Sequence, residues 1–592
     1  MSSKSKPIFL LPIVIALGFI PMIVRAHTYS SGLSQFDWFP DASEWQTDFF
    51  EWYKMAAIIL VAAVMCGLFI YRCLKEEKKW LKGDYSWYLL AGYAVLALFS
   101  ALFSPYREFA FKGSYEVFES VWVVLGYVIM CYYTCQMLQT ENDARFVAKY
   151  VGIEILIITL IGFFQYLGFD LFRTTFGKKL ITPTGMWSGL DTLSFTFPLR
   201  TSYTTLYNTN YLAFYYGLLI PILIVLFLFS KKLVEQVIYA VFAILCFATM
   251  VGSNSKSALL ALGITFVLGC VVLHKYLKKY FWIPLLALAG FALIVGLYAN
   301  RLGGFENLYK AIFVGVESDP DSYAIKDIDT LDDEIVFDLG EEQLHLSYEE
   351  TDDGMIYVYM LDKNGNLLPS ELNETTFVLD DPKYAGCAVT PVYLDEEHLG
   401  LQVLMDEKIW YFAKLEDGTY YYCNAIGKYT KIPDVQKSAL LSNSLYSGRG
   451  MLWNYVIPKL KSCLILGKGS NTFLFVYPQD NYVYKKYANT EGLFDVKAHS
   501  FYFQQMIENG ILALLLLLAF YAWYLIRSIK LYMKTREFTF ASMLGLGIAL
   551  GTFDYMIIGI ANDSNVNTAP VFWVLLGAGM AMNHMVEKRD EK

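Results

Sequence analysis

Charged residues are scarce in this sequence. They make up 17% of its 592 residues, whereas hydrophobic residues make up 56% and the mean hydropathy is +0.39. This balance excludes a chain of ordinary soluble domains, although the length alone would hold several of them. It favours an integral membrane protein, whose spanning helices each need roughly 18 or more apolar residues in succession.

Cysteine is scarce as well, and its spacing excludes the common cysteine motifs. No two of the nine cysteines form a CxxC pair, so the sequence does not predict a zinc or thiol redox site. Six of them lie in or beside apolar stretches, where they pack as small apolar side chains. Cys387, Cys423 and Cys463 fall in the largest predicted outer loop, where a disulfide is permitted. A disulfide and free thiols are both open alternatives there.

Long apolar stretches, in contrast, are abundant. Twelve of them predict membrane-spanning helices. They cover residues 7–24, 55–71, 86–104, 117–137, 150–169, 210–230, 236–252, 256–273, 281–299, 501–526, 540–560 and 569–584. The predicted fold is therefore an all-α polytopic membrane bundle. Nine spans lie in residues 1–299, a large loop follows over 300–498, and three spans lie in 499–592.

The basic residues predict the orientation of these helices. With the N-terminus in the cytoplasm, the inner loops and both termini hold 21 Lys and Arg residues, and the short outer segments hold 9. Cytoplasmic loops of membrane proteins carry such an excess of basic residues. An even number of spans also places both termini on one side. We therefore expect both termini in the cytoplasm and residues 300–498 outside it.

The first apolar stretch has a second interpretation. Lys4 and Lys6, the apolar residues that follow and Ala26 are also typical of a secretory signal peptide, which would be removed after residue 26. We favour a retained spanning helix, because the apolar run is long for a signal peptide. Cleavage would leave eleven spans.

Negative charge is concentrated within the large outer loop. Residues 316–436 hold 28 Asp and Glu, 7 Lys and no Arg, a net charge of −21. The whole chain carries −9, so the remainder carries the difference, +12. An acidic module is thus inserted into a basic membrane protein, and residues 437–498 return the chain to the bundle.

Short runs of β-forming residues predict that this acidic module is all-β. The predicted strands are Ile335–Asp338, Leu344–Tyr348, Ile356–Leu361, Thr376–Leu379, Gln402–Met405, Ile409–Ala413 and Thr419–Cys423. Asn364-Gly365 and Asp417-Gly418 lie between such runs and are typical of hairpin turns. We find no catalytic pattern within the module, so a small binding or shielding domain is the interpretation we favour.

Four ionisable side chains on the predicted outer side are candidates for a functional site, because charges near the membrane are costly. They are Arg200, Lys256, Arg449 and His499. Lys256 is the only ionisable group in the turn Gly252–Ala258, although a lysine that merely reaches the interface explains it equally well. His499 stands at the start of the predicted tenth span, beside other polar groups.

These residues belong to longer motifs that together resemble one family. The motifs are Ser104-Pro105…Phe111-Lys112-Gly113, Arg200…Asn208-Thr209-Asn210, Ser255-Lys256-Ser257-Ala258, Arg449…Trp453, Leu466-Gly467-Lys468-Gly469…Phe473 and Ala498-His499-Ser500-Phe501-Tyr502…Glu508-Asn509-Gly510-Ile511-Leu512. In their order, their spacing and their shared position on the predicted outer side, these motifs resemble the core of the O-antigen ligase/O-antigen polymerase family. The resemblance covers most of spans three to ten. The sequence departs from the family at Lys256, where arginine is usual, and at Ser500, where asparagine is usual. The acidic module is an addition.

The resemblance implies a fold and an activity. The family's fold is a membrane bundle related to the lipid-dependent membrane glycosyltransferases. Its members transfer a glycan from an undecaprenyl-diphosphate carrier to an acceptor hydroxyl on the outer face of the bacterial inner membrane, as ligase or polymerase. No metal or other cofactor is used. The implied partners are the lipid-linked donor, a glycan or lipid-glycan acceptor and membrane lipids, without nucleic acid.

The resemblance also implies roles for the candidate residues. Arg449, Arg200 and Lys256 would bind the donor diphosphate and stabilise the charge that develops on it. Lysine offers a point charge rather than a planar fork, so Lys256 would bind the anion less tightly than the arginine usual in the family. His499 would act with Arg449 in catalysis, its neutral imidazole removing the proton of the acceptor hydroxyl.

Three further polar residues are candidates for orienting these groups. They are Glu508, Asn210 and Asp554. For the two acids, a buried carboxyl group with satisfied hydrogen bonds is the interpretation we favour.

Two other functions are compatible with the sequence. A transporter or flippase of lipid-linked glycans is the main alternative, because twelve spans suit that class equally well. Against it, the sequence shows no convincing internal repeat and no paired interrupted helices. A surface-binding protein, in which the acidic module is the active part, is the third.

Overall fold

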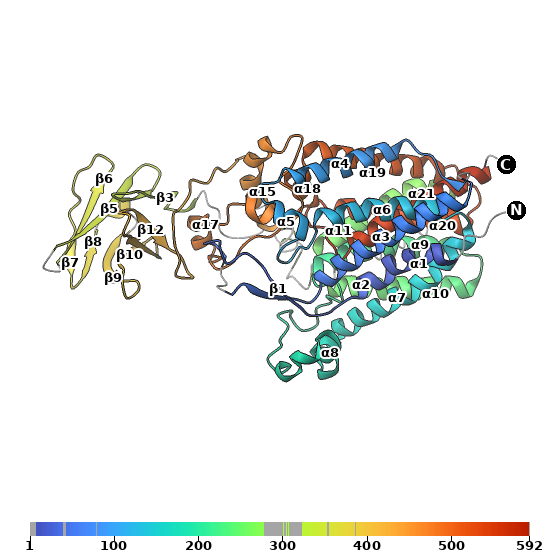
Figure 1. Ribbon diagram of the computed structural model, residues 1–592, viewed down its shortest axis with the longest axis horizontal. Coiled ribbons are helices and arrows are strands. Elements are labelled where there is room, and N and C mark those ends of the chain that lie inside the picture. The colour runs from blue at the N-terminus through green and yellow to red at the C-terminus, as the bar shows by residue number, and fades with distance from the viewer. Residues whose placement is uncertain are drawn as a thin grey trace.

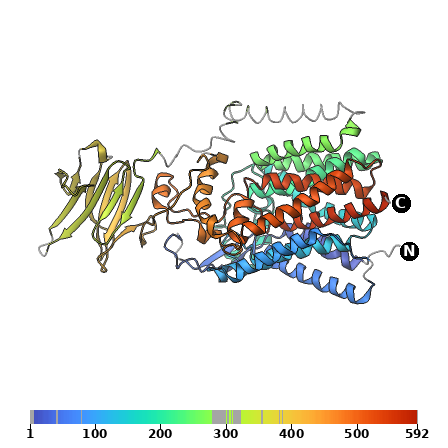
Figure 2. The ribbon, with the colours of Figure 1, turned by 90° about the horizontal axis from the view of Figure 1, so that it is seen from above.

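The computed structural model has two parts, an elongated helical bundle and a smaller β domain beyond one end of it (Figure 1). The chain ends lie together at the opposite end of the bundle (Figure 2). The structure describes residues 7–39, 43–77, 80–277, 322–351, 355–379, 381–384, 386–443 and 445–590, and single residues at 296, 300, 304, 306 and 309.

Seven helices among the described residues are long and apolar enough to cross a membrane. They are α3 (Trp52–Lys75), α7 (Glu141–Leu167), α9 (Thr209–Phe229), α10 (Leu233–Gly252), α19 (Ile511–Tyr532), α20 (Phe540–Ile558) and α21 (Ala569–Asp590). Four further apolar helices are shorter. These are the continuous helix of α1 (Pro7–Val14), η1 (Ile15–Phe19) and α2 (Ile20–Met22), with α4 (Ser86–Leu102), α6 (Val121–Met137) and α11 (Lys256–Val272). A multi-pass membrane protein is therefore confirmed at this coarse level.

Each of these eleven helices overlaps one predicted span, and the span predicted over 281–299 lies outside the described residues. The first apolar stretch packs into the bundle, where Phe9, Ile13 and Leu17 are buried. The hydroxyl of Tyr133 donates a hydrogen bond to the carbonyl oxygen of Phe9 over 2.8 Å. Residues 7–22 are thus part of the main core in this structure.

Helices α9, α20 and α21 form the centre of the bundle. Of the most apolar 18 residues, 78% are buried in α9 and in α20 and 89% in α21, against 17% in α10. α9 is apolar and aromatic on all sides, as expected of a helix surrounded by others. Gly551 of α20 lies against the backbone of Leu218 in α9, so only a residue without a side chain allows this approach.

The predicted boundary of span 501–526 is wrong. Residues Phe501–Asn509 form a separate short helix, α18, and the spanning helix α19 begins at Ile511. Gly510 separates the two with a φ of +97°, and a Cβ atom there would lie 2.4 Å from the carbonyl oxygen of Ile465. Glycine tolerates both the conformation and the contact. His499 therefore precedes a short helix and does not open the membrane span itself.

The acidic stretch is folded as two antiparallel sheets, which confirms a β insertion over residues 327–430. One sheet has the order β3 (Asp327–Thr330), β4 (Ile335–Asp338), β5 (Gln343–Glu350), β6 (Ile356–Asp362). The other has the order β13 (Tyr429–Thr430), β12 (Tyr420–Cys423), β11 (Lys408–Lys414), β10 (Leu399–Met405), β9 (Ala388–Tyr393), β8 (Thr376–Val378), β7 (Glu371–Asn373). The sequence missed β3, β7, β9 and β13. Asp417-Gly418 forms the β11–β12 turn as predicted, whereas the turn at Asn364-Gly365 is followed by a single bridge, Leu361–Leu367.

The two sheets share one hydrophobic core, which a later part of the chain completes. Alternate residues of β5 point inward, and Leu346 packs in the same cluster as Trp410 of β11. Tyr482 and Val483 belong to this cluster as well. They lie in α17 (Tyr482–Tyr487), beyond the acidic stretch. Residues 316–436 alone therefore do not complete the hydrophobic core of the β domain.

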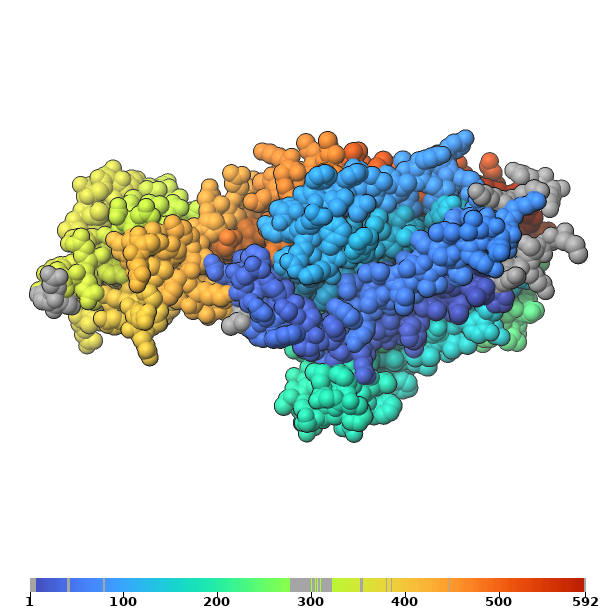
Figure 3. All heavy atoms as spheres, viewed as in Figure 1, coloured from blue at the N-terminus to red at the C-terminus, as the bar shows by residue number. Residues whose placement is uncertain are grey.

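The first outer segment also contacts the β domain. Its strands β1 (His27–Ser30) and β2 (Trp45–Asp48) pair with each other. The Nζ atom of Lys428 donates hydrogen bonds to the carbonyl oxygens of Ser34 and Phe36 at 3.2 and 3.0 Å. The space-filling view shows this segment running from the bundle towards the β domain, while the segment with α8 (Thr175–Ile181) projects sideways (Figure 3).

All nine cysteines are free thiols. Cys387 is buried in the β-domain core, whereas Cys463 is buried in a separate cluster beside α18. The disulfide alternative for Cys387, Cys423 and Cys463 therefore does not occur in this structure.

Candidate functional site

His499 lies at the end of the bundle nearest the β domain, immediately before α18 (Figure 1). Its backbone has a φ of +50°, which few residues other than glycine adopt. Its Nδ1 atom is 3.0 Å from Oδ2 of Asp563, whose carboxylate is buried, while the His499 side chain is 45% exposed. A carboxylate at Nδ1 favours the tautomer with its proton on that atom. The contact therefore leaves Nε2 as the ring nitrogen without a proton in that tautomer.

Arg449 lies in α15 (Leu445–Val456) and approaches the loop between α20 and α21, which contains Asp563. Its Nη2 atom donates a hydrogen bond to Oδ1 of Asn562 over 3.4 Å. Burial lowers the pKa of the Arg449 guanidinium and Asp563 opposes this change, so the side chain stays charged near neutral pH. The indole of Trp453 donates to the carbonyl oxygen of Ala498 over 2.8 Å, which fixes α15 against the residue before His499. Arg449 and His499 thus contact two neighbouring residues of this loop, Asn562 and Asp563.

The turn that contains Lys256 reaches this loop as well. The Nδ2 atom of Asn562 donates to Oγ of Ser257 over 2.6 Å. Lys256 is the first residue of α11 and is half-buried. Asn562 therefore links the start of α11 to Arg449, and the backbone of Lys256 stands one residue from this link.

Arg200 lies apart from these residues. Its side chain is exposed and packs beside Gly168, where α7 ends. In the described part of the chain, no hydrogen bond or ion pair connects Arg200 to Arg449 or His499. Its φ of +62° and the hydrogen bond from Ser202 N to Gly252 O fix this segment against α10. The sequence predicted Arg200 on the same side as Lys256, Arg449 and His499. In the structure it lies at that end of the bundle but makes no described contact with Arg449 or His499.

The glycine pair at Gly467 and Gly469 does not form a phosphate cradle in this structure. The backbone N–H groups of Lys468 and Gly469 donate to the carbonyl oxygens of Ile507 and Glu508 at 2.8 and 2.9 Å. A Cβ atom at Gly467 would lie 2.3 Å from the backbone of Glu508. These glycines therefore allow close packing against α18, and their amides are occupied.

Glu508 and Asn210 also have structural partners. Glu508 is buried, and its Oε1 accepts a hydrogen bond from Nε2 of Gln504 over 2.6 Å. Burial raises the pKa of Glu508 to about 8, while the backbone N–H of Asn471 opposes this change. Asn210 lies in the first turn of α9, where its N–H donates to Oδ1 of the N-cap residue Asn208. Asp554 is fully buried about one turn before α20 ends at Ile558. Neither of its carboxylate oxygens has a hydrogen-bond partner among the described residues, so the satisfied carboxyl group expected from the sequence does not occur there.

Sequence reasoning missed Asn562 and Asp563, although a local signal was present. The run 561–568 between the last two spans holds three asparagines, an aspartate, a serine and a threonine. Most of its side chains are buried. Polar residues packed so densely between two apolar stretches indicate a site rather than a solvated loop.

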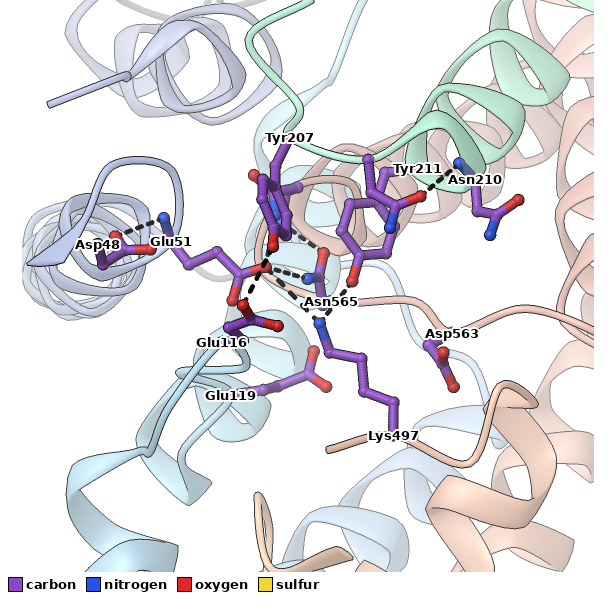
Figure 4. A network of polar contacts seen from close by, with 12 residues as sticks. Asp48, Glu51, Glu116, Glu119, Tyr207, Asn210, Tyr211, Lys497, Asp563 and Asn565 are labelled. Atoms are coloured by element: carbon purple, nitrogen blue, oxygen red, sulfur yellow. Dashed lines mark hydrogen bonds and ion pairs between the residues drawn. The ribbon is translucent and has the colours of Figure 1, made fainter. Parts of the chain in front are cut away.

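A second group of buried polar residues lies behind this loop, and the sequence did not point to it (Figure 4). We call it the Glu51 cluster, and it consists of Glu51, Glu119, Tyr211, Lys497 and Asn565. Oε1 of Glu51 accepts a hydrogen bond from Nδ2 of Asn565 over 2.6 Å and lies 3.9 Å from Nζ of Lys497. Nζ of Lys497 donates to the hydroxyl of Tyr211 over 2.6 Å.

Burial shifts the carboxyl groups of the Glu51 cluster towards their neutral forms. Burial raises the pKa of Glu51 to about 8, and Lys497 opposes the shift. Burial raises the pKa of Glu119 to about 7, and the hydrogen bond from Tyr127 and the charge of Lys497 oppose it. Both groups therefore change protonation state near neutral pH, as functional carboxyl groups often do.

Comparison with known proteins gives no family for this chain. No protein-family model, curated protein or solved structure matches it. Among the described residues, no group of His, Cys, Asp and Glu side chains is arranged to hold a metal ion. The chemistry of the site therefore has to be derived from its own geometry.

That geometry combines a base with a fixed cation. His499 offers Nε2 as a proton acceptor, because Asp563 holds the opposite edge of the ring. Arg449 supplies a half-buried positive charge from α15, where its guanidinium donates to Asn562, the residue before Asp563. Such a pair suits a reaction in which a hydroxyl loses a proton while negative charge develops on a leaving group.

Proposed function

We propose that this protein transfers a glycan from an undecaprenyl-diphosphate-linked donor to an acceptor hydroxyl, as an O-antigen ligase or polymerase does. It acts as a metal-independent membrane glycosyltransferase at the outer face of the bacterial inner membrane. The observation that carries the proposal is the His499–Asp563 pair beside Arg449, at one end of a membrane bundle.

The proposed arrangement in the membrane has twelve spans, with both termini in the cytoplasm. The excess of basic residues, 21 against 9, supports this orientation. The chain ends and the β domain lie at opposite ends of the bundle, which agrees with termini inside and a β domain outside (Figure 1).

In the proposed reaction, the acceptor oxygen attacks the anomeric carbon of the donor glycan. The new C–O bond forms as the bond from that carbon to the diphosphate oxygen breaks, and the electron pair leaves with the diphosphate. Nε2 of His499 takes the proton of the acceptor hydroxyl. Asp563 stabilises the imidazolium that results, because its Oδ2 accepts the hydrogen bond from Nδ1.

The cations have separate roles in this proposal. Arg449 binds the diphosphate where its charge increases, because a half-buried guanidinium can donate two parallel hydrogen bonds to phosphate oxygens. Lys256 adds a point charge from the start of α11. Arg200, which is exposed at the same end of the bundle, binds the donor as it arrives.

Reconstitution with labelled lipid-linked glycan and sizing of the products tests the function. We expect His499→Ala to lower the transfer rate by about 10²–10⁴ while donor binding stays near wild type. Asp563→Asn should lower the rate as well, since the amide stabilises the imidazolium less well than a carboxylate. Arg449→Ala should weaken both donor binding and turnover, the latter by about 10²–10³.

The double variant of His499 and Arg449 provides a further check. Its loss should be smaller than the product of the two single losses, because groups that act as a unit are not additive. Wild-type transfer by His499→Ala would contradict the mechanism. Movement of lipid-linked glycan across the membrane without transfer would instead favour a transporter or flippase.

A further inference from the structure

The Glu51 cluster is built by segments that are remote in the sequence. Glu51 is the N-cap residue of α3, Tyr211 lies in α9, and Asn565 follows Asp563 in the loop between α20 and α21. Lys497 stands two residues before His499, and Figure 4 shows its side chain between Glu51 and Asp563. The cluster therefore adjoins the proposed proton acceptor.

Two carboxylate oxygens at this place are buried without a hydrogen-bond partner among the described residues. One is Oε2 of Glu51, whose side chain is only 1% exposed. The other is Oδ1 of Asp563, whose second oxygen is held by His499. Buried polar atoms are almost always hydrogen-bonded, so these two unpaired oxygens, which lie on either side of Lys497 in Figure 4, indicate partners that come from a bound molecule.

The chemistry of the cluster selects among possible ligands. The cluster and Asp563 hold three carboxyl groups against the single ammonium group of Lys497, and each carboxyl group that ionises repels phosphate, so the donor diphosphate does not suit this place. Lys497 lies 3.9 Å from Glu51 and would repel a metal ion. Sugar hydroxyls suit it, because each can donate to a carboxylate and accept from an ammonium or amide group.

We propose that the Glu51 cluster binds the hydroxyl groups next to the attacking one on the acceptor sugar. The attacking oxygen lies at Nε2 of His499, and its neighbours on the ring reach Oε2 of Glu51 and Oδ1 of Asp563. Lys497 and Asn565 keep Glu51 in place from its other side. The cluster then determines which acceptor the enzyme accepts. This inference rests on the proposed glycan transfer.

Glu51→Gln is a sharp test, because it retains the oxygen that accepts from Asn565 and can turn only the unpaired oxygen into an N–H₂ group. The probes are methyl glycosides of common hexoses and hexosamines and their single deoxy analogues, used with lipid-linked glycan from the same cells as donor. We expect the wild-type protein to prefer at least one glycoside over its deoxy analogue by about tenfold or more. Glu51→Gln should remove this preference and raise the KM for that glycoside about tenfold or more, with donor binding unchanged.

Glu154→Gln is the matched control, because Oε2 of Glu154 is also buried and unpaired but lies against Gly18 in the core helix of residues 7–22. It should leave the preference intact. If Glu51→Gln does not fold, Tyr211→Phe removes only the hydroxyl bonded to Lys497 and should reduce the preference in part.

The outcomes separate this inference from the proposed function. An unchanged hydroxyl preference in the Glu51 and Tyr211 variants, with His499→Ala inactive, would overturn the acceptor site and leave glycan transfer standing. Loss of donor binding in Glu51→Gln would overturn it too, because the cluster would then belong to the donor. Absence of glycan transfer by the wild-type protein would remove the function itself.

Discussion

His499 and Asp563 are 64 residues apart in the sequence, yet their side chains meet at 3.0 Å. Asp563 is buried and its neighbour Asn562 contacts both Arg449 and Ser257. One short loop therefore positions a base, a guanidinium and the turn of Lys256.

Lys256 offers a test of charge geometry. We expect Lys256→Arg to retain or improve transfer, because arginine supplies the planar fork that binds phosphate with two hydrogen bonds. Lys256→Ala should lose much of the activity. Initial rates with labelled donor measure both variants. Wild-type turnover in the alanine variant would show that Lys256 only reaches towards the interface.

Glu119 predicts a pH-dependent stability. Burial raises its pKa to about 7 from an ordinary value of 4.5, against the hydrogen bond from Tyr127. Between these values the unfolded chain is ionised while the folded chain keeps its proton, so the raised pKa costs increasing stability as pH rises from about 4.5 to about 7. Glu119→Gln cannot ionise and keeps the oxygen that Tyr127 contacts. The full cost is roughly 3 kcal/mol above pH 7.

Thermal unfolding of the purified protein checks this. Glu119→Gln should melt close to the wild type at pH 4.5 and clearly above it at pH 8. The surface variant Glu108→Gln is the control and should show no such divergence, because its partner Lys112 is also exposed. A difference that stays constant with pH would contradict the assignment of Glu119.

At the scale of elements, short helices of the outer segments hold the site and the β domain in place. α15 fixes Ala498 through Trp453, and α18 stands between His499 and the break at Gly510. α17 supplies Tyr482 and Val483 to the core of the β domain. The segment 437–498 is thus shared between the two parts of the molecule.

This sharing changes what the isolated acidic module should do. We expect residues 322–436 to show strand by circular dichroism, because both sheets lie within them. Extending the segment to residue 495 should raise its melting temperature, since Tyr482 and Val483 then complete the core and the ring of Tyr487 stacks on Tyr323. A helical or disordered spectrum, or equal melting temperatures, would contradict this account.

At the scale of the whole molecule, the bundle places the polar site and the β domain at the end opposite the chain termini (Figure 2). The orientation across the membrane is a prediction from the basic residues. Reporter fusions after Asn300 and after Lys592 measure it. We expect the first to report the outer side and the second the cytoplasm, and a cytoplasmic signal after Asn300 would be incompatible with donor chemistry at the outer face.

The sequence by itself determined the features that depend on local pattern. Apolar length predicted each described membrane helix, since a helix that crosses lipid must satisfy its backbone internally and cover it with apolar side chains. Alternation and turn residues predicted β4–β6, β8 and β10–β12 within the acidic stretch for the same kind of local reason. His499 and Arg449 were candidates because their motifs are short and continuous, and their functional role stays a prediction.

Only the tertiary structure decided which distant groups meet. Asn565 and Glu51 are 514 residues apart and form a 2.6 Å hydrogen bond, which no local period encodes. The break at Gly510 likewise depends on the backbone of Ile465, because a contact between segments requires a residue without a side chain. Helix packing brings such groups together after the helices have formed, so the carboxylates behind His499 became visible only in the folded bundle.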